Sequence, residues 1–202
     1  MAKVNLRGIV NWLWRALAIA VVLSPAWSVA QTESCAIDEA TAKEAVAFLE
    51  AAKGDNGVPP ECVIGAIGKL RDQRSKEVID LLTGYIDYGR PREHRISRGA
   101  NAEQYPATSE LFAIGRPVLP ALVRVLVRTE VSQVARDNAV RTIMMIYRDD
   151  PPSGIHFLVS EAAQLHDRGD ASMLRQAASE AVRWCSDRDH FVCEVALSSA
   201  GF

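Results

Sequence analysis

Apolar and polar positions alternate with a helical period along most of the chain. Between residues 38 and 185, apolar side chains recur every three or four positions, and polar or proline-containing segments interrupt these runs. Such spacing gathers the apolar side chains on one face of a helix, where a neighbouring helix can bury them. The sequence therefore predicts an all-α protein.

The predicted helices follow one another as four antiparallel hairpins of two helices each. Their approximate bounds are 38–52, 59–70, 75–88, 108–114, 117–128, 132–148, 150–168 and 170–185. The first helices begin near 38, 75, 117 and 153, at intervals of 37, 42 and 36 residues. A repeat of this length is typical of helical arrays, in which each hairpin covers the apolar flank of the one before.

Residues with strong conformational preferences set the expected helix ends. Asp38 and Asp170 are the expected N-caps of two helices, since a carboxylate accepts hydrogen bonds from the first free backbone N–H groups. Asp150 is expected to cap the helix that Pro151 and Pro152 open. Glycine is expected to end two helices, at Gly115 and at Gly169.

The segment 117–146 carries the most specific motif. Its first helix has Leu119, Leu122 and Leu126 with Pro120 near the start, and its second has Ala135, Arg136 and Ala139 ahead of Ile143 and Ile146. This order resembles the HEAT-repeat family of the armadillo-like superfamily, although Ala135 stands where the family usually has Val. The resemblance implies a short right-handed HEAT-like α-solenoid of about four helical hairpins, with the second helices on the concave, partner-binding face. A compact bundle of the same eight helices remains the alternative.

The first thirty residues have the pattern of a secretory signal peptide. Lys3, Arg7 and Arg15 precede an apolar stretch over 16–23, and the small residues Ser28 and Ala30 flank an expected cleavage site before residue 31. The apolar stretch is too short for a membrane anchor. We therefore expect a secreted or periplasmic protein without stable membrane insertion. Its expected parts are a cleaved signal peptide (1–30), a repeat domain (31–186) with an inserted loop (89–105), and a C-terminal tail (187–202).

The four cysteines all follow the expected cleavage site, and an even count in an oxidising compartment indicates disulfides. Of three possible pairings we favour Cys35 with Cys62 and Cys185 with Cys193. Each of these disulfides would lie within one terminal unit and would stabilise an end that has no outer neighbour. The first pair requires that the chain doubles back or that the first helix is short. His190 lies between the last two cysteines, but their spacing matches no zinc motif and no metal is expected.

The charge and the absence of catalytic motifs narrow the function. The formal charge of −2 becomes −5 once Lys3, Arg7 and Arg15 are removed, so nucleic acid is not an expected partner. No phosphate-binding glycine loop, HExxH, GxSxG or EF-hand motif occurs. No two of the four histidines are three or four positions apart. We therefore expect no cofactor and assign no catalytic residue.

Two groups of residues are candidates for binding. The first is the inserted loop, whose arginines are flanked by Tyr85, Tyr88 and Tyr105. The alternative interpretation is that this loop is a solvated insertion without a binding role. The second is the polar face of the second helices. The candidate residues are Arg90, Arg92, Arg95 and Arg98 in the loop and Arg141, Arg175, Glu180 and Arg183 on the helices. Arg136 is left out, because in HEAT repeats this position usually makes an internal polar contact between repeats.

The function expected from these features is that of an exported, non-catalytic scaffold that binds a protein or peptide in the cell envelope. One alternative is an enzyme or enzyme accessory, since some HEAT-like families act as lyases. Another is a purely structural spacer. An enzyme would need an acid–base pair facing across the concave groove, and none is expected.

Overall fold

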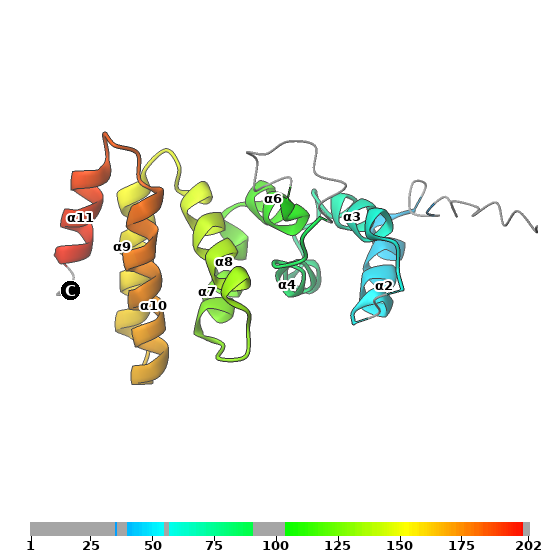
Figure 1. Ribbon diagram of the computed structural model, residues 1–202, viewed down its shortest axis with the longest axis horizontal. Helices are drawn as coiled ribbons and strands as arrows, with labels where there is room; N and C mark the ends of the chain where they lie inside the picture. The colour runs from blue at the N-terminus through cyan, green and yellow to red at the C-terminus, as the bar shows by residue number, and fades with distance from the viewer. Residues whose placement is uncertain (1–34, 36–39, 55–56, 91–103, 200–202) are drawn as a thin grey trace, which may run out of the picture. The chain divides into compact units, whose positions relative to one another are not determined.

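The computed structural model describes Cys35 and residues 40–54, 57–90 and 104–199, all within one compact unit, Cys35–Phe202 (Figure 1). The described residues form nine α-helices and two short 3-10 helices, and none of them is in a strand. The helices are α2 (Ala42–Ala52), α3 (Pro60–Gly68), α4 (Lys76–Gly84), α6 (Pro106–Ile114), η2 (Arg116–Val118), α7 (Leu119–Val127), α8 (Gln133–Ile146), α9 (Pro151–Gln164), α10 (Arg168–Ala181), η3 (Val182–Trp184) and α11 (His190–Ser198). The all-α prediction is confirmed for these residues. The expected signal peptide lies outside them.

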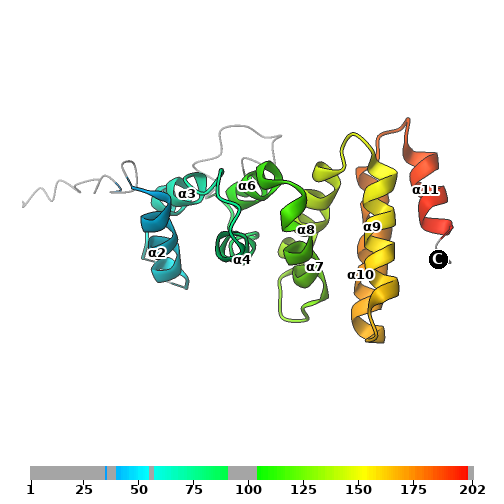
Figure 2. The same cartoon turned by 180° about the vertical axis from the view of Figure 1, so that it is seen from behind.

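Consecutive helices pack in pairs, as the hairpin prediction requires. α2 contacts α3, α4 contacts α6, α7 contacts α8, and α9 contacts α10. Each pair also contacts the next one, through α3 with α6, α4 with α7, α6 with α8, and α8 with α10 (Figures 1 and 2). Among the described helices, these contacts link each pair to the next one. The last helix, α11, packs against α9.

The predicted core residues of the third hairpin are buried. Leu119, Leu122 and Leu126 on α7 face Ala135, Ala139 and Ile143 on α8, and none of these side chains is more than 6% exposed. Ile146, at the end of α8, is only half-buried. Removing this apolar surface from water is the main stabilising contribution to the hairpin.

Helix α2 begins later than predicted. Its N-cap is Thr41, whose hydroxyl accepts a hydrogen bond from the Glu44 backbone N–H, while the Glu44 carboxylate accepts one from the Thr41 N–H at 2.7 Å. This reciprocal pair satisfies two backbone donors that the helix itself leaves free. Asp38, the predicted cap, lies outside the described residues.

The boundary between α9 and α10 also differs from the prediction. Helix α9 ends at Gln164, before the predicted stop at Gly169, and Asp167 rather than Asp170 caps α10. The Asp167 carboxylate accepts a hydrogen bond from the Asp170 N–H at 2.9 Å. Asp170 therefore lies in the first turn, where its negative charge interacts favourably with the helix dipole. Asp150 occupies the N-cap position of α9, but its side chain accepts no helix N–H and instead binds the Ser153 hydroxyl.

Both predicted disulfides are present. The Cα atoms are 5.4 Å apart in Cys35–Cys62 and 6.7 Å apart in Cys185–Cys193. The first helix is shorter than predicted, since it begins at Ala42. Helix α11 was not predicted: residues 187–202 were expected to form a C-terminal tail, whereas His190–Ser198 are helical. It places Cys193 and Ala196 against the core.

Polar contacts also connect neighbouring hairpins. The Tyr85 hydroxyl donates to the Leu49 carbonyl at 2.5 Å, and the Asn138 side-chain amide donates to the Ile86 carbonyl at 2.8 Å. Both contacts are buried, where an unpaired polar group would be costly. Tyr85 therefore holds two hairpins together and is not part of a binding surface at the base of the loop.

Candidate functional site

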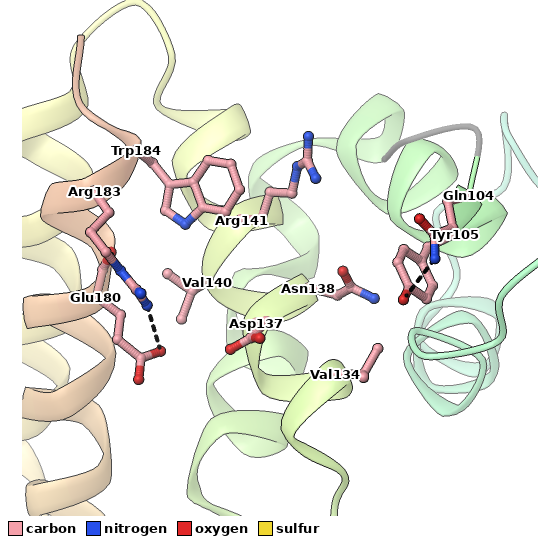
Figure 3. Close-up of a pocket in the computed structure, with 10 residues that line it drawn as sticks. All are labelled: Gln104, Tyr105, Val134, Asp137, Asn138, Val140, Arg141, Glu180, Arg183 and Trp184. Carbon is pink, nitrogen blue, oxygen red and sulfur yellow. Dashed lines mark hydrogen bonds and ion pairs between the residues drawn. The ribbon is translucent and has the colours of Figure 1, made fainter. Parts of the chain in front are cut away.

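A cavity of about 400 Å³ opens between α6, α8 and α10, and we call it the main cavity (Figure 3). Its lining comes from the two residues before α6, from α8, and from the end of α10 with η3. The lining residues are Gln104, Tyr105, Val134, Asp137, Asn138, Val140, Arg141, Glu180, Arg183 and Trp184. All of them lie on or next to the second helices of the second, third and fourth hairpins.

Helix α8 supplies one wall because four of its residues share a face. Val134 and Asn138 are four positions apart, as are Asp137 and Arg141, which aligns the four residues along one side of the helix. The Ser132 hydroxyl fixes the start of α8 by accepting from the Ala135 N–H at 3.0 Å. Asn138 then fixes the face itself through its buried bond to the second hairpin.

Arg141 and Trp184 form the centre of the site. The Arg141 guanidinium lies over the Trp184 ring, 4.8 Å from its centroid, and so connects α8 to η3 by a cation–π contact. The indole is nevertheless 43% exposed. Burial lowers the pKa of Arg141, and its Nη1 atom is buried without a hydrogen-bond partner. The side chain stays charged, because a guanidinium does not deprotonate in proteins.

Two carboxylates line the main cavity from opposite helices, Asp137 on α8 and Glu180 on α10 (Figure 3). The sequence predicts no acid–base pair in this groove, so the partners of the two carboxylates matter. The Asp137 carboxylate accepts from the Gln133 amide at 2.8 Å. Glu180 accepts from Gln176 at 3.1 Å and lies 3.9 Å from the Arg183 guanidinium. Each carboxylate thus has partners on its own helix or on the 3-10 turn that follows it.

Two smaller cavities, each of about 220 Å³, adjoin the main one. The first shares Glu180 with the main cavity and lies between α7, α8 and α10. The second shares Arg141 and Trp184 and extends toward Met145 and Ser186. We call the three cavities together the second-helix groove. Arg141 and Trp184 line both the main cavity and the second of the smaller cavities.

The structure brings together some of the predicted binding residues. Arg141, Glu180 and Arg183 line the main cavity, whereas Arg175 is exposed on α10 and does not. Arg90 lies at the loop base, where its backbone N–H donates to the Gln104 carbonyl at 2.8 Å. The other predicted loop residues, Arg92, Arg95 and Arg98, lie outside the described residues.

Arg136 makes an internal contact, although not the contact between repeats that was expected. Its guanidinium donates to the carbonyls of Arg128 and Thr129 at 2.8 and 3.2 Å, and so satisfies backbone acceptors just after α7. The contact joins the two helices of one hairpin, however, and not two repeats.

Trp184, Val134 and Asp137 were missed by the sequence analysis. The α8 residues could have been found from their spacing relative to Arg141. Trp184 could have been found because it is the only tryptophan after residue 27. An isolated, exposed tryptophan at the end of a second helix is typical of a recognition site.

The possible ligand set at the C-terminal end is not available to a metal. Cys185 and Cys193 are joined in the disulfide, and the His190 imidazole instead lies 3.4 Å from the Glu194 carboxylate. No cluster of metal-binding side chains occurs among the described residues. No described helix is long and apolar enough to cross a membrane.

No protein-family model, no curated protein and no solved structure matches the chain. The resemblance to HEAT repeats therefore rests on the motif in residues 117–146.

Proposed function

We propose that this chain is an exported HEAT-like α-solenoid that binds a protein or peptide partner in its second-helix groove and performs no catalysis. The observation that carries the proposal is the composition of the main cavity, whose lining comes from the second helices of three consecutive hairpins. It combines an exposed tryptophan, apolar side chains and two arginines, and tryptophan and arginine are enriched where proteins bind one another.

The solenoid is supported by the pattern of helix contacts. Extensive contacts among the described helices join consecutive pairs, which is the arrangement of repeat proteins. Export is supported by the two disulfides, which persist in oxidising compartments.

Site-specific photo-crosslinking tests the location of binding. A benzophenone amino acid at Val134, in the main cavity, should capture a partner during expression of the full chain in its native envelope. The matched position is Ser160, which is exposed on α9 outside the groove. Capture of one defined protein at Val134 and its absence at Ser160 is the expected result. Equal capture at both positions, or capture only at Ser160, would contradict the proposed site.

The pair Asp137 and Glu180 favours an enzyme as the second candidate function. An acid–base mechanism would require both carboxylates to face one substrate, whereas a binding groove would tolerate their replacement by amides. The double variant Asp137→Asn/Glu180→Gln should therefore still give the Val134 crosslink. Accumulation of a trapped small-molecule substrate in that variant, detected by native mass spectrometry, would favour the enzyme instead. A structural spacer would give no specific crosslink at either position.

A further inference from the structure

Of the two arginines that line the main cavity, Arg183 lies near the Glu180 carboxylate and Arg141 has no counter-charge among the described residues. The other charged residues of the main cavity have partners close by in sequence: Asp137 binds Gln133, and Glu180 binds Gln176 and Arg183. Within the described part of the chain, no carboxylate lies within ion-pair distance of Arg141, and its recorded contact is the stack on Trp184. The main cavity therefore holds, in Arg141, a described cation that a ligand can neutralise.

The stack on Trp184 also orients this cation. The Arg141 Cζ atom lies over the indole, so Trp184 holds the guanidinium where both side chains line the cavity (Figure 3). The Nη1 atom is buried and has no acceptor. Because that atom is closed to solvent, a ligand would be bound through the other guanidinium N–H groups. A planar carboxylate matches a guanidinium edge because it accepts two parallel hydrogen bonds.

The charge balance of the main cavity favours a singly charged ligand. Arg141 and Arg183 are opposed by Asp137 and Glu180, so the cavity is formally neutral. A carboxylate adds one negative charge, whereas a phosphate group adds nearly two close to the existing carboxylates. Acidic side chains therefore fit this site better than phosphorylated ones.

The position of Arg141 between two cavities indicates how the ligand lies. Arg141 and Trp184 line both the main cavity, of about 400 Å³, and the cavity of about 220 Å³ that reaches Met145 and Ser186. A chain whose carboxylate reaches Arg141 from an internal residue can continue into both cavities. A chain ending at Arg141 would fill only one of them.

We propose that Arg141, stacked on Trp184, binds the carboxylate of an Asp or Glu side chain within an extended segment of the partner. This inference rests on the proposed function, because it assumes that the groove is the binding site. It adds the chemical group of the partner that the groove recognises, a side-chain carboxylate.

Trp184 provides the probe for a direct test. The chain has four tryptophans, and replacing Trp12, Trp14 and Trp27 with Phe leaves Trp184 as the only one whether or not the first thirty residues are removed. The full chain with these replacements is titrated with three pools of mixed hexapeptides, followed by Trp184 emission. The first pool has blocked ends and Glu at a fixed central position. The second has Gln at that position, and the third has Gln there with a free C-terminal carboxylate.

The Glu pool should bind at least about tenfold more tightly than the Gln pool, which corresponds to one charge-assisted interaction. Arg141→Gln should abolish this preference, and Arg141→Lys should reduce it, because an ammonium lacks the planar pair of donors. The control Arg175→Gln removes the same charge from an exposed position outside the cavities and should keep the preference. Melting temperatures of all variants are measured alongside, and Arg141→Lys decides the outcome if Arg141→Gln does not fold.

Equal binding of the Glu and Gln pools, or an unchanged preference in the Arg141 variants, would overturn the inference. Tightest binding of the third pool would also overturn it and would assign the site to a chain end. Unchanged Trp184 emission with all three pools contradicts it as well. The proposed function is decided separately by the crosslinks at Val134 and Ser160, so the two proposals can fail independently.

Discussion

At the scale of single residues, the most informative contact is the ion pair between Arg71 and Glu110. It joins the turn after α3 to α6, with Nε–Oε2 and Nη2–Oε1 distances of 2.9 and 3.2 Å. The Glu110 side chain is 7% exposed, whereas that of Arg71 is 63% exposed. The pair raises the pKa of Arg71, with hydrogen bonding to Glu110 as the main cause. Loss of the arginine would therefore leave a carboxylate buried without its charged partner.

We expect Arg71→Met to lower the midpoint denaturant concentration of unfolding, because it leaves the buried Glu110 carboxylate without its charged partner. The double variant Arg71→Met/Glu110→Leu should recover most of this loss, since an apolar pair needs no hydrogen bonds. Denaturant unfolding of the two variants and the parent measures both effects. A single variant as stable as the parent would show that the pair contributes nothing.

Some residue-level features could be predicted from the sequence, and others could not. Gly115 was expected to end a helix, and it does so with φ of 80°, a conformation that only glycine adopts easily. The ion pair of Arg71 and Glu110 spans 39 positions, and no local pattern links its two residues. The cap of α2 was missed, although Thr41 and Glu44 have the spacing of a capping box.

At the scale of helices, the contact between α8 and α9 depends on one glycine. A Cβ atom at Gly154 would lie 3.0 Å from the Met144 sulfur and 3.1 Å from the Tyr147 Cβ. Tyr147 also stacks on Phe157 of α9, with ring centroids 6.0 Å apart, so it has little room to move. The absence of a side chain at Gly154 lets the third and fourth hairpins approach closely.

Gly154→Val should destabilise the protein by about 1 to 3 kcal/mol, because the added carbons would push α9 away from α8. Gly68→Ala is the matched control, since nothing lies within 4 Å of a Cβ there. It should be neutral or stabilise by up to about 1 kcal/mol through the unfolded chain. Thermal unfolding of both variants distinguishes them. A Gly154→Val variant at least as stable as Gly68→Ala would contradict this account of the helix contact.

The C-terminal disulfide is expected to hold α11 on α9. Replacing Cys185 and Cys193 together with alanine should lower the stability of α11 by about 2 to 4 kcal/mol, the usual contribution of a disulfide. Because contacts are mostly between neighbours, the loss should stay local. Hydrogen exchange should speed up in α11 and remain unchanged in α2 and α3. Uniformly faster exchange along the described helices would instead indicate one cooperative bundle.

Helix existence was easier to predict than helix ends. The apolar spacing correctly indicated eight of the nine described helices, because burial of one face imposes a regular pattern. Helix α11 was missed because its apolar residues do not form one buried face. Phe191, Val192 and Val195 are largely exposed while Cys193 is buried. The boundary between α9 and α10 was misplaced because two aspartates, Asp167 and Asp170, both suit an N-cap.

At the scale of the whole described unit, the site is a consequence of how hairpins follow one another. The second helices of three hairpins line the main cavity, and this arrangement follows from their packing order. Arg141 and Arg183 were predicted as binding residues from that order. Trp184 completes the site only because η3 turns it toward α8, where it meets Arg141. Such a contact between distant segments depends on tertiary geometry that helical periodicity does not contain.

The central claim, that a partner binds along the second helices, is tested most directly by hydrogen exchange of the full chain with and without the partner captured at Val134. The proposed site predicts slower exchange in α8, in the last turn of α10 and in η3, with α9 and α11 unchanged. Slower exchange confined to α9 and α11, with α8 unaffected, would contradict it.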